Sequence, residues 1–573
     1  MKKGIVLLLL SLSSRIIAQD LSNLAHQKPF AISGTLDIRL SAYKSNIPTP
    51  FYPSSGYTIS GTPTISIYGF VLPFSFVYTN QQLPVFGQPF NQFGISPTYK
   101  HFTLHIGYRN INYSKYALAD YQLFGAGAEY EKGNWKVGLC YGRLRKMALL
   151  GLDSSSGLAP YSYQRKAIAG LVKYGNEKKF IAISFLSGKD NPCSVPDEAK
   201  TKVQNYYNPT PAGNMVVDLH FKLPLFIKNL SLESESGISY YTNDITSSIN
   251  QNNIQKQEIP LSGLLSNFTK LNATSHYYTA LDGKLNYVNK KGLNTFLKYK
   301  KVDPNFQSMG VYYMQGDIQD ILAGGSIPFL HNKIRIGGSI GRQNNNLKNT
   351  NTMSSVRWIG SGTANYSDSK FGVDMNYYNF SSDQSPTVSR YADSLRITQS
   401  TKTLNISPRY CFSTKTAFHS FNLSFGLNTA LDLNNSLTDT GQLRELYTQN
   451  VGFNYSVSIT KQDLNINTGL IFTNLTDHGL YAYKSFGVNV GATKTLFAKK
   501  VNLSINGGLY KTIQLATTSV NHTASVSAGY LLTKKLHTDL LLMYNDAPGV
   551  SSITNLPKGT REFRSELNFS YTF

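Results

Sequence analysis

The chain has 573 residues and a formal net charge of +23, but only 15% of its residues are charged. Soluble domains carry about 25% charged residues, so a string of soluble domains is not expected. A basic balance suits nucleic acid, anionic lipid or an anion-attracting pore, and the distribution of the lysines decides among these partners.

Residues 1–19 have the features of a secretory signal peptide. Lys2 and Lys3 form a basic start, and Ile5 to Leu12 form a short apolar stretch. This stretch is too short to span a bilayer, so we expect cleavage before Asp20 and export. No later run reaches about 18 apolar residues, which argues against an inner-membrane helix.

Residues 20–98 differ from the rest of the chain because they are rich in proline, which the interior of a sheet tolerates poorly. Short strand-like pieces cover residues 34–43, 64–70 and 74–78. We expect a plug-like region inside the lumen, packed by Phe70, Phe74, Phe76 and Tyr78. Alternatively, the same pieces form two to four further wall strands, giving 24 or 26 in all. The prolines are Pro48, Pro50, Pro53, Pro63, Pro73, Pro84, Pro89 and Pro97.

Residues 99–573 repeat a strict alternation of apolar and small polar side chains. Successive side chains of a strand point to opposite faces, so each run has one apolar face and one polar face. The polar face suits a hydrated lumen better than the interior of a sandwich. One such run sets Val501, Leu503, Ile505 and Leu509 against Asn502, Ser504, Asn506 and Gly508.

Short turns alternate with long polar loops through this part of the chain, as in outer-membrane barrels. The longer loops are predicted at residues 190–211, 242–271, 381–400 and 547–560. The pattern predicts an all-β fold, a transmembrane antiparallel β-barrel of about 22 strands. The predicted strands start near residues 100, 121, 134, 164, 179, 214, 230, 273, 293, 319, 334, 353, 371, 401, 418, 447, 463, 483, 500, 520, 536 and 561.

Lysine recurs in the short turns, for example at Lys132, Lys333 and Lys461. A lysine at a membrane rim can extend its ammonium group to anionic lipid head groups. Nucleic-acid binding would need basic and aromatic residues that converge on one groove, which this spread does not suggest. We therefore expect outer-membrane lipid as a partner and no nucleic acid.

The last strand alternates Leu567, Phe569, Tyr571 and Phe573 with polar residues and stops at an aromatic residue. This resembles the C-terminal assembly signal of bacterial outer-membrane barrels. The resemblance implies that the barrel-insertion machinery is a partner through the Phe573 terminus, in the outer membrane of a Gram-negative cell.

The signal peptide at 1–19, the plug-like region at 20–98 and the barrel at 99–573 together resemble TonB-dependent transporters. More loosely, they resemble large outer-membrane proteins of Bacteroidota. The resemblance implies transport through a large plugged barrel. No TonB-box-like stretch follows Asp20, which leaves a passive pore and a scaffold open besides an energised importer.

No residue pattern predicts catalysis, a cofactor or a metal site. His101 and His105 fall in a predicted strand, where four residues span roughly 13 Å, too far for a joint metal site. Residues 337–341 match G-x-S-x-G around Ser339, but inside an alternating strand rather than at a strand-to-helix turn. The three cysteines, Cys140, Cys193 and Cys411, are far apart and suggest no disulfide framework.

Two functions remain from the sequence. The first is an outer-membrane, porin-like pore or transporter for small to medium solutes. The alternative is a non-catalytic barrel subunit that scaffolds an outer-membrane complex, in secretion or surface assembly, with other outer-membrane proteins as partners.

Overall fold

The computed structural model describes residues 29–47, 52–80, 91–149, 161–201, 209–248, 271–386, 397–432, 444–477, 482–514, 517–548 and 559–573. The predicted signal peptide lies outside these ranges. Within them the chain is almost entirely β, with short helical turns at η2 (Pro192–Ser194), α2 (Asp197–Thr201) and η5 (Thr460–Gln462). In this described part of the chain, no helix has the length and apolar character needed to cross a membrane.

The strands of the first half are β1 (Ala31–Ser33), β2 (Thr35–Ser45), β3 (Ser55–Gly61), β4 (Thr64–Ile67), β5 (Phe70–Thr79), β6 (Gln92–Ile95), β7 (Thr98–Tyr99), β8 (Phe102–Asn110), β9 (Gln122–Lys132), β10 (Trp135–Arg145), β11 (Ala148–Leu149), β12 (Tyr161–Ser162), β13 (Arg165–Gly175), β14 (Phe180–Asp190), β15 (Gly213–Pro224), β16 (Leu230–Thr242), β17 (Ser275–Val288) and β18 (Asn294–Val302). Those of the second half are β19 (Ile318–Phe329), β20 (Ile334–Asn344), β21 (Met353–Ser367), β22 (Phe371–Pro386), β23 (Ile397–Ser413), β24 (Ala417–Asp432), β25 (Arg444–Ile459), β26 (Leu464–Asp477), β27 (Ala482–Leu496), β28 (Val501–Gln514), β29 (Thr517–Leu531), β30 (Leu536–Pro548) and β31 (Gly559–Thr572).

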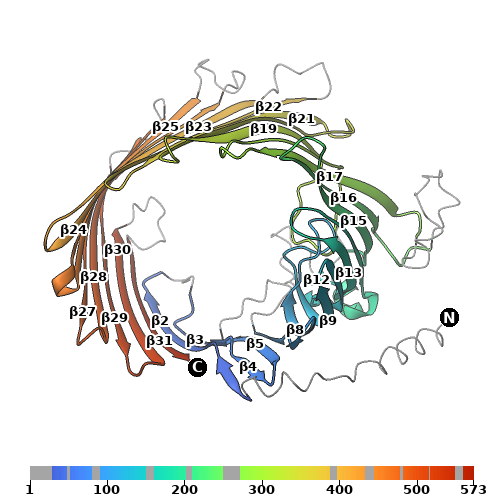
Figure 1. Cartoon of the computed structure of the whole chain (residues 1–573), viewed down its shortest axis with the longest axis horizontal. Coiled ribbons are helices and arrows are strands. Elements are labelled where there is room, and N and C mark those ends of the chain that lie inside the picture. The colour runs from blue at the N-terminus through green and yellow to red at the C-terminus, as the bar shows by residue number, and fades with distance from the viewer. Residues whose placement is uncertain are drawn as a thin grey trace.

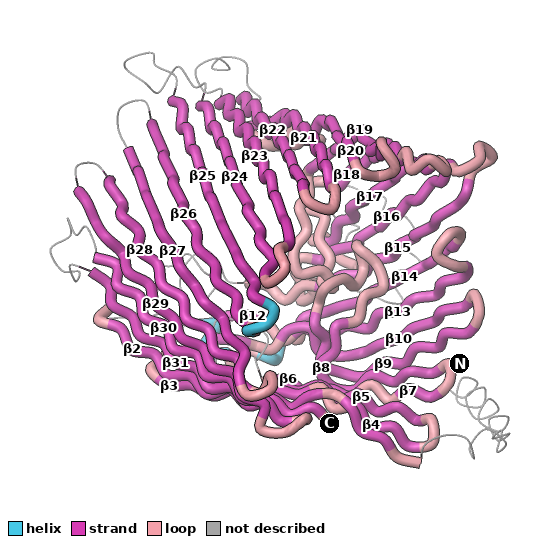
Figure 2. Tube along the Cα trace, turned by 60° about the vertical axis from the view of Figure 1, so that its left-hand side comes forward, coloured by secondary structure: helices cyan, strands magenta, loops and turns pink. Residues whose placement is uncertain are grey.

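Apart from β11 and β12, which pair only with each other, these strands join one antiparallel sheet that closes into a barrel of 26 strands, shown in Figure 1 as a ring around an interior. Most wall strands pair with the next strand in the sequence, and the long strands run side by side with a common tilt (Figure 2). The predicted barrel is thereby confirmed, at the upper end of the predicted range of strands. The 22 strands expected from residue 100 onward all start within about four residues of their predicted positions.

The barrel closes where β2 pairs with β31, from Thr35 opposite Thr572 to Ser45 opposite Glu562. The C-terminus therefore lies beside the first strands of the chain (Figure 1). Since β3 and β5 continue the wall from β2, the prediction of a plug-like region in residues 20–98 is wrong for the described part of that segment. The alternative of further wall strands is correct.

Three described prolines of this segment fit a wall because they lie where its ladders are interrupted. Pro63 separates β3 from β4, and Pro97 separates β6 from β7. Pro73 of β5 lies opposite Thr64, and its carbonyl accepts from Ser96, between those two breaks. A missing N–H costs little where the neighbouring strand has no acceptor in register.

The aromatic residues expected to fill the lumen belong to β5 instead. Phe76 lies opposite Phe93, whose ring packs edge-on against Tyr108 and Phe124 on the outer face of the wall. Phe70 and Tyr78 are about half exposed. The other predicted aromatic, Phe74, lies in the same strand opposite Ile95.

The two ends of the barrel differ in their connections, as predicted. One end carries tight turns, and from the β7–β8 turn to the β29–β30 turn each contains a lysine or directly follows one. The other end carries the longer connections, among them the segments between β8 and β9 and between β18 and β19. The tight-turn end corresponds to the periplasmic side of outer-membrane barrels.

The seam between β2 and β31 can be tested by a disulfide. The Phe573 N–H donates to the Gly34 carbonyl oxygen at 3.1 Å, so the alternate pair Arg39 and Asn568 is a non-hydrogen-bonded one. Its Cα atoms should lie about 4.5 Å apart, within the range that a disulfide spans. In a background without native cysteines, R39C/N568C should crosslink and change the mobility of the unfolded chain on a non-reducing gel.

T538C/F569C, across the β30–β31 pair, serves as the positive control for crosslinking efficiency. R39C combined with N422C, on the distant β24, serves as the negative control. A folded R39C/N568C protein that stays uncrosslinked while T538C/F569C reacts would contradict closure by β2.

Candidate functional site

The lumen is the largest feature of the molecule. Twenty-six strands spaced about 4.8 Å apart and tilted by about 40° give a circumference of roughly 160 Å, or a diameter of about 50 Å if the ring were circular. Barrels of 22 strands already need a plug to close them. The segments of the chain that fold into this lumen therefore determine what can pass through it.

Two connections from the long-loop end fold into the lumen and contact each other. They are residues 111–121, between β8 and β9, and residues 303–317, between β18 and β19. The Ala119 N–H donates to the Gly310 carbonyl oxygen at 3.0 Å, and Ser308 Oγ donates to the Ala117 carbonyl oxygen at 3.1 Å. The ring of Tyr116 packs edge-on against Phe306. We call the pair the inner ledge.

The wall holds the inner ledge by hydrogen bonds from side chains that face the lumen. Asn214 Oδ1 accepts from the Met309 N–H at 2.9 Å, and Ser239 Oγ donates to the Gln307 carbonyl oxygen at 2.6 Å. Glu235 Oε1 accepts from the Lys115 N–H at 2.7 Å. These three backbone groups of the ledge are thus paired with wall side chains inside the barrel.

Apolar packing holds the ledge as well. Leu118 of the ledge is fully buried, and so are Leu186 and Val216 of the wall. These residues belong to the largest buried cluster among the described residues, which comprises Ile111, Tyr113, Tyr116, Ala117, Leu118, Leu123, Cys140, Leu144, Ala167, Ala169, Leu171, Phe180, Ala182, Leu186, Ala212, Val216, Ala280, Val302, Phe306, Met309 and Ile318. Burial raises the pKa of the Tyr113 and Tyr116 hydroxyls, so both remain protonated.

Glycines in the wall make room for the ledge tyrosines. A β-carbon on Gly138 would lie 2.7 Å from the Tyr113 hydroxyl, and one on Gly237 would lie 2.7 Å from the Tyr116 β-carbon. Figure 1 shows loops of this part of the chain inside the ring, on the side of β8, β12 and β13. The ledge therefore narrows the lumen from one side.

The wall that carries the ledge is highly charged. Lys115 lies 3.4 Å from Glu235 and 3.5 Å from Asp282, and Lys298 lies 3.3 Å from Asp282. Nearer the short turns, Lys222 and His220 both approach Glu233 at 3.2 Å. Near the long-loop end, Arg165 binds Asp190 through two hydrogen bonds of 2.8 and 3.0 Å. Most of these charged side chains have a partner of opposite sign. On this wall they hold Lys115, and with it the ledge, in position.

The opposite wall, β24–β29, presents amides, hydroxyls and glycines to the lumen. The register places Asn422 opposite Asn454, Asn454 opposite Gly469, and Gly491 opposite Asn506. The predicted polar face is thus the lumenal face, and among its described side chains over these strands Asp477, at the long-loop end, is the one charged group.

The motif candidates from the sequence lie apart from one another. Ser339 lies in the middle of β20, as predicted, and shares a hydrogen bond of 2.7 Å with the Ser361 hydroxyl. His101 precedes β8 and packs against Tyr130, whereas His105 lies within β8 and its Nδ1 shares a 2.9 Å hydrogen bond with Ser96. The structure brings none of these three residues together.

The cysteines are all free among the described residues. Cys140 and Cys411 lie in strands β10 and β23, and Cys193 lies in η2. Cys140 belongs to the buried cluster under the ledge, where it fills space.

The outer face of the wall is apolar around the ring. Large side chains that would be buried in a soluble protein are more than half exposed there, among them Phe102, Ile183, Ile340, Val490 and Ile505. An apolar band around a closed barrel with a polar interior requires lipid outside and water inside. The chain is an outer-membrane β-barrel. Its outer face binds membrane lipid.

Comparisons with known proteins agree with a large barrel and go no further. No protein-family model and no curated protein matches the chain. It is similar to the P pilus usher PapC translocation pore, with 10% identity, a TM-score of 0.35, and coverage of 95% of this chain and 99% of that one.

It is also similar to BauA, the ferric preacinetobactin receptor from Acinetobacter baumannii, with 9% identity, a TM-score of 0.38, and coverage of 95% and 80%. Against PapC in an E. coli P pilus tip assembly intermediate, identity is 13%, the TM-score 0.41 and coverage 94% and 61%. Similarity at this level says nothing about what this chain carries or assembles with.

The inner ledge is the functional element that the sequence analysis missed. Two signals point to it. Residues 116–119 are an apolar run within a loop, and the lumenal faces of β13–β15 carry Ala169, Leu171, Leu186 and Val216 where a hydrated lumen would have polar side chains. Apolar residues on a face that should be wet indicate that something packs against it.

Replacing Gly237 by valine should displace the ledge without disturbing the wall. Its side chain would occupy the space of the Tyr116 β-carbon, 2.7 Å away. Trypsin should then cut after Lys115 about tenfold faster in the folded protein, because the local opening free energy falls. The cut is measured by mass spectrometry of the released peptides.

G362V on β21 is the matched control, because a β-carbon there meets only the Tyr377 β-carbon at 4.0 Å. If trypsin cut after Lys115 at the same rate in both variants, the position of the ledge would not depend on the close approach of Tyr116 to Gly237.

Proposed function

We propose that this barrel is a pore or transporter that moves small to medium solutes across the outer membrane. The observation that carries the proposal is the lumen: a ring of 26 strands whose polar wall along β24–β29 carries almost no charge among its described side chains, with the inner ledge on the opposite side. Two short loops are too small to fill a ring of about 50 Å, so the wall stays accessible to water in the described part of the chain.

A second candidate is a barrel subunit of an outer-membrane complex. An unobstructed opening of this width would leak, so the cell must close it. The described residues narrow it from one side, which favours a partner protein that occupies the remainder, in secretion or surface assembly.

We also propose that the chain is not an enzyme. Ser339 of β20 is hydrogen-bonded to Ser361 of the neighbouring strand β21, and no histidine is among the contacts described for it. Purified folded protein is expected to hydrolyse neither peptides nor phospholipids.

We further propose that the insertion machinery recognises the strand that ends at Phe573, whose ring packs edge-on against Tyr571.

In planar bilayers, the purified full chain should conduct ions with a single-channel conductance above that of a sixteen-stranded porin recorded in the same salt, because its ring is wider. G237V should conduct at least as well as the parent protein, since the ledge no longer narrows the lumen. Protein that inserts and shows a heat-dependent shift on SDS gels but does not conduct would contradict the pore and favour the scaffold.

A further inference from the structure

The lumenal wall of β24–β29 carries almost no charge. Lys484, Lys494 and Lys511 of these strands lie on the outer face by their register, opposite Asn474, Leu464 and Phe486 respectively. Among the described lumenal side chains of these six strands, Asp477 alone is charged, at the long-loop end. A solute that contacts this wall meets neutral hydrogen-bonding groups.

Asparagines on this wall flank glycines across neighbouring strands. Gly469 lies between Asn454 and Asn489, and a β-carbon on it would be 2.5 Å from the Oδ1 atoms of both. Gly491 lies between Asn467 and Asn506 in the same way. The amides therefore lie over the glycines, close to the wall, rather than projecting into the lumen.

Each such amide offers two donors and one acceptor oxygen with no net charge. Ser504 and Ser525 add hydroxyl groups beside Asn506, whose Nδ2 donates to them at 3.3 and 3.5 Å. A regular array of neutral donors and acceptors matches a ligand that carries many hydroxyl groups, because each hydroxyl both donates and accepts.

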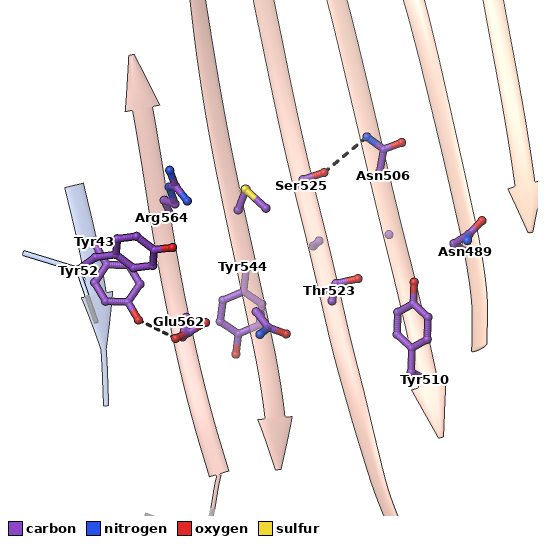
Figure 3. Close-up of a pocket in the computed structure, with 14 residues that line it drawn as sticks. Tyr43, Tyr52, Asn489, Asn506, Tyr510, Thr523, Ser525, Tyr544, Glu562 and Arg564 are labelled. Atoms are coloured by element: carbon purple, nitrogen blue, oxygen red, sulfur yellow. Dashed lines mark hydrogen bonds between the residues drawn. The ribbon is translucent and has the colours of Figure 1, made fainter. Parts of the chain in front are cut away.

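A recess of about 550 Å³ lies at one side of this wall, between β2 and strands β27–β31 (Figure 3). This volume is within the range of small-molecule sites. Asn506, Thr523 and Ser525 line its middle, and Asn489 lies at its far side next to Tyr510, as Figure 3 shows.

Aromatic rings stand at both ends of the recess. At one end, Tyr43 and Tyr52 pack edge to face with their centroids 5.3 Å apart. At the other end, the Tyr510 ring covers Gly487 and Gly508, so it lies along the wall. Sugar rings have apolar C–H faces that pack on aromatic faces, while their hydroxyls need polar partners at the edge.

The charged groups of the recess already have partners. Glu562 accepts a hydrogen bond of 2.6 Å from the Tyr43 hydroxyl. Arg564 pairs with Glu566, and its guanidinium carbon lies 5.3 Å from the centre of the Tyr52 ring. An anionic ligand would have to compete with Glu566 for Arg564 and would share the recess with the Glu562 carboxylate, which disfavours it.

We propose that this recess and the adjoining amide wall bind neutral oligosaccharides. This inference rests on the proposed function and names its substrate class. Tyr510 and the Tyr43–Tyr52 pair provide the surfaces for sugar rings, and Asn489, Asn506 and their neighbours bind the hydroxyls.

The test is calorimetry on the full chain in detergent, with four probes: a linear neutral glucan oligosaccharide, a sulfated glucan of the same length, polyethylene glycol of matched size, and a neutral polar peptide. The neutral glucan should bind and the others should not. Y510A should weaken its binding about tenfold through the lost ring contact. Y378A, which removes a half-exposed tyrosine of β22 outside the recess, should change binding less than about twofold.

Both variants must retain the heat-dependent gel shift of the parent protein. Tighter binding of the sulfated glucan or of the peptide, no binding of the neutral glucan, or equal effects of Y510A and Y378A would each overturn the proposal. Protein that conducts without binding the glucan would leave the pore standing and remove the sugar site. Protein that binds the glucan without conducting would leave the site and remove the pore.

Discussion

The fold depends on one constraint: within lipid, every backbone N–H and C=O group of the wall must find a partner in the wall itself. An open sheet would leave two edges unpaired, at a cost of several kcal/mol for each group, so the sheet must close. Here β2 provides the closure, because it pairs with β31 over its whole length and brings the beginning and end of the wall together. The alternation of side chains then fixes which face is wet and which is apolar.

Closure of 26 strands creates a second problem, since so wide a ring encloses more water than a selective membrane protein tolerates. Within the described residues, the chain narrows the lumen from one side. Small and apolar lumenal residues on β10 and β13–β15 accept the ledge, and Glu235 of β16 and Asp282 of β17 form ion pairs with Lys115 of the ledge. The opposite wall stays neutral and hydrated, which is why the two sides of one lumen differ in chemistry.

The strands from β8 onward could be predicted because lumen and lipid impose opposite demands on alternate residues, and short lysine turns separate the runs. The first strands were predicted only as short pieces, with the wall as the less favoured alternative, since Pro63, Pro73 and Pro97 are typical of non-sheet structure and only the pairing shows that they lie at breaks in the ladder. The ledge was missed because contacts between residues near 117 and near 310 depend on tertiary structure. The recess combines residues of β2 with residues of β27–β31, a neighbourhood that follows from closure alone.

The central claim, a lipid-embedded barrel with a hydrated lumen, is tested most directly by single cysteines along β28 in protein reconstituted into vesicles. Residues 503 and 505 should face lipid, and residues 504 and 506 should face water, by the register of β28 with its neighbours. A water-soluble maleimide should label S504C and N506C, and a quencher attached to lipid chains should quench a fluorophore placed at L503C and I505C. Labelling and quenching that fail to alternate along these four positions would contradict the account.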